Sequence, residues 1–395
     1  MKKEVSFIAV LLGAFFTSFG MSFIWPLTSV YLHDNLHISL TLVGLVLFFN
    51  SLASVIGNVV GGLGFDRRNP YYLMLAGGIV MTVTLIVLTL FHQAVPFAIC
   101  LFFLGLAAGW NGTLVSALGA TLKRFDGRYV FNMIYFVQNF GIVIGSSVVG
   151  FLYDWDLRLP FFVSTLISLG FLAVVLIGYH PLRNLKRATN ERKTDKTKIK
   201  LPKMNQYLMI TLLSMLLITW TMYQQWGSNV SVYMTSLGIP FRDYSVLWTV
   251  NAGLILLIQF FIVRYGQYIK NHFMPIYIGI LMFAFSFVVL SVAKQYYLFV
   301  TAMVLLTIGE ALAFPQVPVI VNRITPEGVK GKYLGLVNSF GSAGRAISPL
   351  FGGLMIETFS CRTLFIVAVF FNLAILLVVW LARQKTQDGL YYYYY

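Results

Sequence analysis

The chain has 395 residues, of which 58% are hydrophobic and only 10% are charged, whereas an ordinary soluble domain is about 25% charged. This composition excludes a soluble enzyme, a disordered chain and a small secreted scaffold. Two cysteines, Cys100 and Cys361, are too few for a disulfide framework or a cysteine-based zinc site. What remains is a protein that crosses a membrane many times and carries a net charge of +15.

Apolar runs long enough to cross a bilayer recur along the whole chain and are joined by short loops. The first run follows two lysines but is too long for a signal peptide and lacks a cleavage site. The tail at 386–395 ends in Tyr391–Tyr395, which is unlike natural sequence, and it is left out of the predicted fold. We predict twelve membrane-spanning helices over residues 6–32, 38–64, 71–92, 95–122, 129–152, 159–180, 204–235, 243–264, 273–293, 297–322, 333–356 and 362–382.

The basic residues are distributed very unevenly between the two sides of these spans. Of the 28 Lys and Arg residues, 23 fall on the side of the N-terminus, four fall on the other side, and Arg345 lies inside a span. The positive-inside rule therefore predicts a protein of the cytoplasmic membrane with both termini in the cytoplasm. The cytoplasmic charges face the headgroups of membrane lipids. Segment 181–203 has no aromatic residue to stack on bases, so we expect a basic linker and no nucleic-acid partner.

The chain resembles itself at an offset of roughly 202 residues. Small residues spaced by four recur at corresponding positions, and such residues let two helix backbones approach closely. Two parallel six-span halves are a transporter architecture. We therefore predict an all-α polytopic membrane protein of two pseudo-symmetric six-helix halves, 1–180 and 204–385, joined by the linker 181–203. The recurring pairs are Ser29–Leu32 with Ser231–Met234, Asn50 with Asn251, and Gly141-x-x-x-Gly145-Ser146 with Gly344-x-x-x-Ser348-Pro349.

Residues 62–69, Gly-Leu-Gly-Phe-Asp-Arg-Arg-Asn, carry a family resemblance. The sequence resembles the major facilitator superfamily, specifically its twelve-span drug/proton antiporter group. By that resemblance, Asp66 and Arg67 belong to a gating charge relay, and Asn69 replaces a glycine that needs a left-handed backbone. Asparagine tolerates this conformation better than most residues. A simple membrane anchor with an acid at a helix end is the alternative. The intramembrane arginine of the family's fourth span falls at Gly105 here.

Two ionisable residues lie deep inside the predicted spans: Glu310 and Arg345. A charge at this depth is costly unless it is paired or hydrated. One interpretation is a structural ion pair between the two residues. The other is proton coupling, in which Glu310 exchanges a proton or contacts substrate as that pair forms and breaks. Arg345 cannot itself release a proton.

Neutral polar and aromatic residues occur mainly in spans that line the central cavity of this superfamily. Each one alone is as compatible with a helix–helix hydrogen bond as with substrate binding. The predicted substrate cavity consists of Trp25, Asn50, Trp110, Asn111, Gln138, Asn139, Gln224, Gln225, Trp226, Asn251 and Asn338.

These observations predict a secondary active transporter, not an enzyme, that exports amphipathic small molecules in exchange for protons. One carboxylate beside an arginine favours neutral, zwitterionic or anionic compounds over polyvalent cations. A transporter or flippase of a specific metabolite, sugar or lipid-linked sugar is the alternative, and a non-transporting receptor is a further one. We expect a monomer with protons as the coupling ion and with neither a cofactor nor a metal.

Overall fold

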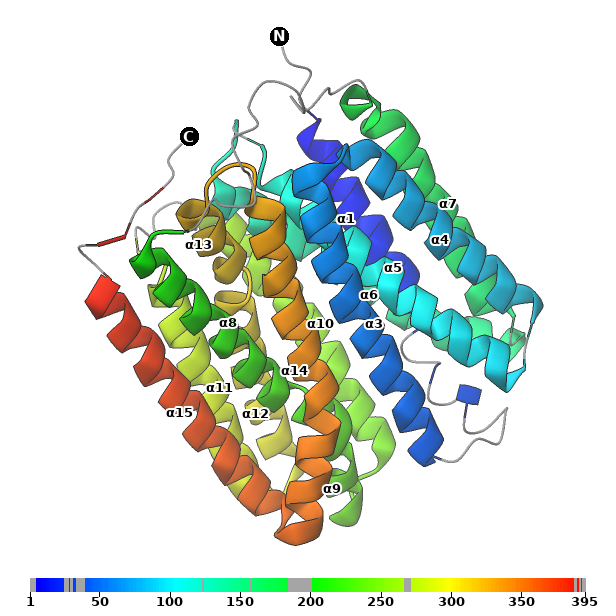
Figure 1. Cartoon of the computed structure of the whole chain (residues 1–395). Helices are drawn as coiled ribbons and strands as arrows, with labels where there is room; N and C mark the ends of the chain where they lie inside the picture. The colour runs from blue at the N-terminus through cyan, green and yellow to red at the C-terminus, as the bar shows by residue number, and fades with distance from the viewer. Residues whose placement is uncertain are drawn as a thin grey trace. The chain divides into compact units, whose positions relative to one another are not determined.

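The computed structural model describes residues 5–24, 28, 31–32, 40–91, 93–122, 124–156, 158–183, 201–265, 271–386, 389–390 and 392. All regular elements in these residues are helices, as the predicted all-α class requires (Figure 1). Ten described segments are long and apolar enough to cross a membrane. Two predicted spans fall outside this set. They contain α1 (Phe7–Ser22), which has 16 residues, and α14 (Lys330–Thr358), which is rich in glycine and serine.

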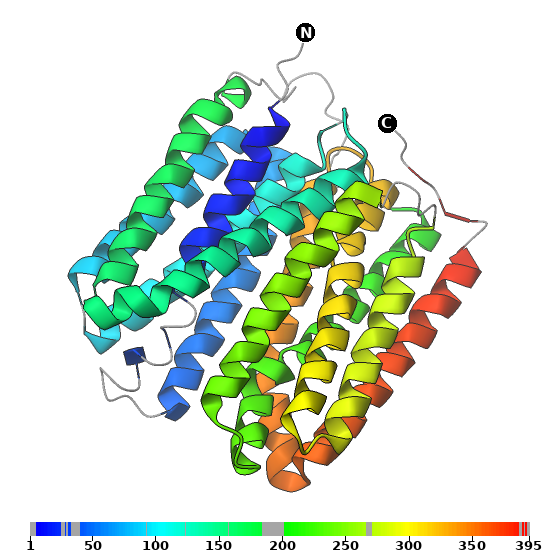
Figure 2. The same cartoon turned by 180° about the vertical axis from the view of Figure 1, so that it is seen from behind.

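The chain forms two compact units, and the first comprises Met1–Lys200 together with Pro326–Ser339. Within it, α1 packs against α5, α6 and α7, and Figure 2 shows α1 between α6 and α7. Helix α5 also packs against α3 and α4. The helices of this unit after α1 are α3 (Leu40–Arg67), α4 (Pro70–Leu90), α5 (Ala94–Gly119), α6 (Gly127–Trp155), α7 (Leu159–Gly178) and the short η2 (His180–Leu182), and the start of α14 also belongs to it.

The second unit comprises Leu201–Thr325 together with Phe340–Tyr395, so that α14 begins in the first unit and ends in the second. Within it, α11 packs against α12 and α15, while α10 packs against α12 and α8 against α15. Its other helices are α8 (Lys203–Tyr223), η4 (Trp226–Val230), α9 (Ser231–Ser236), α10 (Phe241–Tyr265), α11 (Met274–Val292), α12 (Tyr296–Ala313), α13 (Gln316–Ile324) and α15 (Cys361–Thr386).

Two predicted spans of the second unit are broken near their middle. Span 204–235 ends as an α-helix at Tyr223 and continues as the π-helical turn η4. Span 297–322 breaks between α12 and α13, because Pro315 has no N–H to donate to the carbonyl of Ala311. That carbonyl accepts a hydrogen bond from Gln259 Nε2 of α10 at 2.8 Å instead. The break therefore leaves no unpaired acceptor at Ala311 in the apolar interior.

Glycines determine the packing of α3 against α5. A methyl group on Gly57 would overlap the carbonyl oxygen of Leu106, and one on Gly109 would overlap that of Ser54. A methyl group on Gly105 would overlap the carbonyl oxygen of Asn50. The two backbones are therefore in direct contact, as small residues allow in membrane helices. The same contact leaves no room for a larger side chain at position 105, which explains why the arginine of the antiporter group is replaced by glycine here.

The repeated small residues also pack helices, as the sequence predicted. In the first unit, a methyl group on Gly141 of α6 would lie 3.1 Å from the carbonyl oxygen of Phe15 in α1. In the second, one on Gly344 of α14 would lie 2.7 Å from the carbonyl oxygen of Leu217 in α8. Each unit thus uses the motif to bring two helices together.

Asn69 differs from its expected conformation. Its φ of −70° and ψ of 121° are extended, not left-handed. The side chain caps α4 by accepting a hydrogen bond from the backbone N–H of Tyr71 at 2.9 Å, and Pro70 occupies the first helical position. Its Nδ2 donates to the carbonyl of Leu182 at 2.9 Å. Asparagine is favoured here as a helix cap, which is a role that glycine's backbone freedom does not supply.

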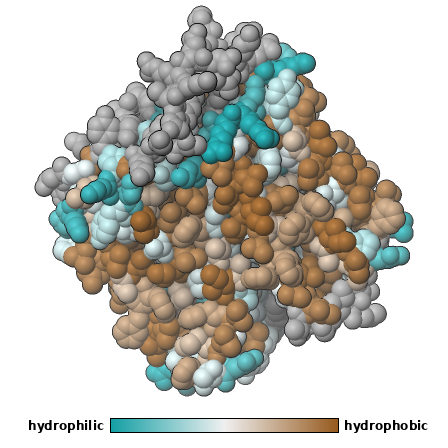
Figure 3. Space-filling view, in the orientation of Figure 1, coloured by the Kyte–Doolittle hydropathy of each residue, from teal (hydrophilic) through white to brown (hydrophobic). Residues whose placement is uncertain are grey.

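The surface matches helices surrounded by lipid. Figure 3 shows hydrophobic side chains over the middle of the helices and hydrophilic side chains near the helix ends. Large apolar residues such as Leu90, Ile177 and Phe370 are among the most exposed. Membrane lipid accounts for this pattern, because in water such a surface would favour aggregation.

We expect Gly105→Ala to destabilise the protein by about 1–3 kcal/mol, because the added methyl group meets backbone that cannot rotate away. Gly112→Ala is the matched control on the same helix, since nothing lies within 4 Å of a methyl group there. The measurement is the midpoint of thermal unfolding of the purified protein in detergent. Equal midpoints for the two variants would contradict the proposed α3–α5 contact.

Candidate functional site

The carboxylate of Glu310 lies in the interior of the second unit. Glu310 is central in the long apolar segment Tyr296–Ile324, in the last turn of α12, and is only 6% exposed. Its Oε2 accepts a hydrogen bond from the Tyr223 hydroxyl at 2.8 Å and one from Asn251 Nδ2 at 3.2 Å. Asn251 Nδ2 also lies 2.8 Å from Thr307 Oγ1. One carboxylate therefore connects α8, α10 and α12.

The guanidinium of Arg345 has different partners. Its carbon lies 4.5 Å from the ring centre of Trp220, and Nη2 donates to Ser342 Oγ at 3.0 Å. Trp220 in turn stacks on Phe314, with ring centres 4.4 Å apart and planes 10° apart. The structure therefore differs from the Glu310–Arg345 ion pair that the sequence suggested. Glu310 accepts hydrogen bonds in one site, and Arg345 lies over an aromatic ring in another.

Two aromatic side chains connect these sites. The ring of Tyr223 meets that of Trp220 edge to face, with centres 5.1 Å apart. The hydroxyl of Tyr223 donates a hydrogen bond to Glu310, and the ring of Trp220 contacts the guanidinium of Arg345. Sequence reasoning identified the two charged residues but missed Trp220, Tyr223, Thr307 and Phe314. A usable signal was the spacing Trp220-x-x-Tyr223, which puts both rings on one face of a helix.

A cluster of polar side chains follows the break after α8. Gln225 Nε2 donates to Ser348 Oγ at 2.9 Å, and Gln225 Oε1 accepts from Asn229 Nδ2 at 2.6 Å. A methyl group on Gly352 would overlap both amides.

Trp226 is fully buried, and its carbonyl accepts from the Tyr244 hydroxyl at 2.8 Å. Gln225, the residue before η4, therefore binds α14, and Trp226, the first residue of η4, binds α10. Gln224 is half-buried beside them.

In the first unit, several predicted cavity residues bind neighbouring backbone. Asn50 Nδ2 donates to the carbonyl of Leu101 at 2.6 Å, and Trp110 Nε1 donates to that of Leu73 at 3.1 Å. Asn139 Nδ2 donates within its own helix, to Tyr135 O at 2.9 Å. The contacts of Asn50 and Trp110 match the helix-packing alternative, whereas that of Asn139 stays within α6.

The remaining predicted cavity residues differ from one another in burial and in their contacts. Asn111 is fully buried against α4, where a methyl group on Gly77 would overlap its side chain. Asn338 belongs to the first unit and donates to Thr113 Oγ1 at 3.1 Å, whereas Arg345 belongs to the second. Gln138 is half-buried on α6, and Trp25 lies outside the described residues.

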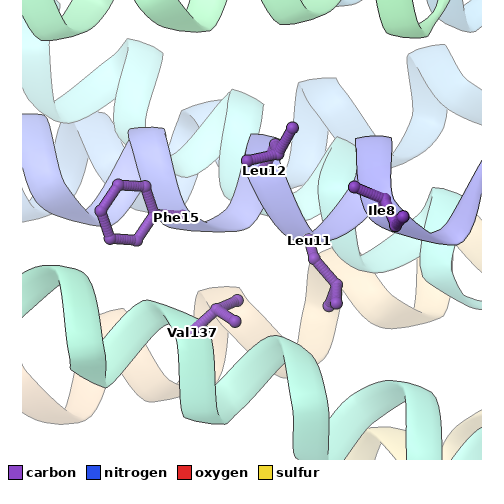
Figure 4. Close-up of a pocket in the computed structure, with 5 residues that line it drawn as sticks. All are labelled: Ile8, Leu11, Leu12, Phe15 and Val137. Atoms are coloured by element: carbon purple, nitrogen blue, oxygen red, sulfur yellow. The ribbon is translucent and has the colours of Figure 1, made fainter.

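An open hollow on the first unit is lined only by apolar side chains. Figure 4 shows Ile8, Leu11, Leu12 and Phe15 from α1 with Val137 from α6. It offers no polar or titratable group, so it provides no chemistry for proton exchange or for selecting a charged substrate.

Asp66 is held at the start of α14. Its Oδ1 accepts from the backbone N–H of Gly331 at 2.9 Å, and its Oδ2 accepts from that of Lys332 at 2.7 Å. The first N–H groups of a helix have no partner within the helix and carry partial positive charge, so a carboxylate suits this position. Arg67 is exposed at the end of α3. The gating role of both residues stays a prediction.

Comparison with known proteins identifies the fold. A sequence model of the Major Facilitator Superfamily matches residues 10–277 and 230–390. The chain belongs to this superfamily. It is 34% identical over 385 residues to the uncharacterized transporter YttB of Bacillus subtilis, covering 96% of this chain and 94% of that one. It is 24% identical over 405 residues to the uncharacterized transporter YqjV of the same organism, covering 96% and 93%.

A solved structure shares the fold. The human organic anion transporter MFSD10 superposes with a TM-score of 0.77 at 14% identity, covering 94% of this chain and 98% of that one. At this identity the likeness concerns the fold alone. The protein is accordingly a multi-pass membrane transporter of the superfamily rather than an enzyme, which confirms the predicted two-half fold.

We expect Asp66→Asn to lower the stability by about 1–3 kcal/mol, because an amide has one oxygen and no charge with which to bind two N–H groups. The measurement is the thermal unfolding midpoint in detergent. Arg67→Gln is the control, because this neighbouring side chain is exposed. A larger loss for the Arg67 variant than for the Asp66 variant would contradict this assignment.

Proposed function

We propose that this superfamily member is a proton-coupled exporter of amphipathic small molecules that works by alternating access, with Glu310 as the proton acceptor. The observation that carries the proposal is the carboxylate itself: it lies in the middle of an apolar span, almost fully buried, and binds donors from two other helices. Ionisable groups at this depth are costly and are typical of proton pathways in transporters.

Gain of a proton changes what Glu310 demands of its neighbours. The ionised group is an acceptor only, and Oε2 accepts from both Tyr223 and Asn251. A protonated carboxyl carries one O–H donor. If that proton resides on Oε2, the Tyr223 hydroxyl or the Asn251 amide must turn to provide an acceptor. In that case protonation alters the contacts between α12, α8 and α10. In this way a single proton can change how the helices of the second six-helix half pack.

The repeat supports a single proton site. Asn50 corresponds to Asn251, and at the same offset of roughly 202 residues Gly105 corresponds to Thr307. In the first unit this position is closed by backbone contact, whereas in the second it holds Thr307 and Asn251 beside Glu310. The proposal that substrates are amphipathic and are exported rests on the resemblance to the drug/proton antiporter group.

We expect Glu310→Gln to abolish coupling, because glutamine keeps the size of the side chain but cannot take up a proton in the physiological range. The protein is reconstituted in vesicles containing the pH indicator pyranine, a pH gradient is imposed, and 2-naphthalenesulfonate or 2-naphthalenemethanol is added. The wild-type protein should release protons when a test compound is added, and the variant should not.

Glu357→Gln is the matched control, because it makes the same chemical change at an exposed position near the end of α14. It should behave as the wild-type protein does. Proton release that persists in the Glu310 variant would overturn the assignment of the coupling residue.

A further inference from the structure

Arg345 presents hydrogen-bond donors that the protein does not use. Within the part of the chain that the structure describes, its polar contact is the hydrogen bond from Nη2 to Ser342 Oγ. A guanidinium has five N–H donors, so four have no acceptor among the described residues. None of its nitrogen atoms is among the fully buried polar atoms that lack a partner. The unused donors are therefore accessible.

The aromatic contact leaves these donors free. The guanidinium carbon of Arg345 lies over the ring face of Trp220, where the attraction is between the charge and the ring. The N–H groups point outward in the guanidinium plane, and this edge forms the two-pronged contact with carboxylates and phosphates. This contact therefore supports the cation without supplying an oxygen acceptor to the unused donors.

The surrounding helices hold this platform in place. Trp220 also stacks on Phe314. A methyl group on Gly344 would lie 2.8 Å from Trp220 Cβ, and one on Gly341 would lie 3.2 Å from Trp220 Nε1. Glycines at both positions thus let the indole lie close to α14. Gly341 lies one turn before Arg345, and Gly344 lies one residue before it. The arrangement is a built support for one cation.

A permanent charge inside a span needs a counter-charge. Among the described residues, the groups that contact Arg345 are a hydroxyl and an aromatic ring rather than a carboxylate. Glu310 is held separately by Tyr223 and Asn251. An anionic ligand would supply the missing charge and fill the unused donors together.

We infer that Arg345 binds the anionic group of the transported substrate, so that the protein selects amphipathic anions bearing a carboxylate, sulfonate or phosphate. This inference rests on the proposed transport function and names its substrate class. It reassigns Arg345 from proton coupling to substrate recognition, with Trp220 as a positioning residue.

The test compares three probes of one shape and different charge: 2-naphthalenesulfonate, 2-naphthalenemethanol and 2-naphthylmethylammonium. Binding to the purified wild-type protein in detergent is measured by calorimetry without any gradient. We expect the sulfonate to bind at least about tenfold more tightly than the alcohol, as one charge-assisted contact allows. Equal affinities for the sulfonate and the alcohol, or tighter binding of the ammonium compound, would overturn the inference whatever the variants do.

Variants then locate the preference. Arg345→Gln should remove it, by lowering the affinity for the sulfonate about tenfold and leaving that for the alcohol unchanged. Arg345→Lys should retain part of it, because lysine keeps the charge but loses the planar fork. Arg362→Gln, at an exposed position at the start of α15, is the matched control. Equal losses for sulfonate and alcohol in the Arg345 variants would indicate a structural role and overturn the inference.

The result is separable from the proton assignment. Glu310→Gln should keep the anion preference in this gradient-free assay, because its carboxylate does not contact the guanidinium in the arrangement described. An anion preference without proton-driven transport would retain this inference and overturn the proposed coupling. Proton-driven transport without an anion preference would do the reverse.

Discussion

The distance at which two helix backbones meet is the constraint on which the two units depend. Lipid offers no partner for a backbone N–H or carbonyl, so each span must be a helix, and packing between helices then relies on small residues. In the first unit, Gly57, Gly105 and Gly109 bring α3 and α5 into direct contact. In the second unit, the repeat replaces one of these glycines with Thr307, and polar side chains meet at that position. The candidate proton site lies where the glycine contact is missing.

The two charged groups inside the second unit do not neutralise each other. A carboxylate and a guanidinium in one membrane half would be expected to neutralise each other, yet each is stabilised by neutral groups. Tyr223 and Asn251 donate to Glu310, while Trp220 faces Arg345. A closed ion pair would bury both charges and leave neither available. In the proposed mechanism, their separation lets Glu310 exchange a proton and Arg345 bind an anion.

Sequence predicted the helical class, twelve spans of which ten are long and apolar enough to cross a membrane among the described residues, and the packing role of the repeated glycines, because hydropathy and small-residue spacing are local signals. It did not predict the partners of the buried groups. Nothing in the order of residues showed that Asn50 and Trp110 bind backbone carbonyls, or that Trp220 covers Arg345. Such partners come from other helices and depend on rotation about each helix axis, which apolar periodicity leaves loosely defined when most faces are apolar.

The helix breaks of the second unit have a mechanical meaning for Glu310. Gly309, the residue before it, lies against Gly279 of α11, where a methyl group on either would come within 2.7 Å of the other's carbonyl oxygen. The helix ends at Ala313, three residues after Glu310, and Pro315 prevents its continuation. Tyr223, the donor of the 2.8 Å hydrogen bond, is itself the last residue of α8. The hydrogen bond thus joins α8 and α12 close to the residues at which each stops being a regular α-helix, so protonation of Glu310 acts on two helix breaks together in the proposed mechanism.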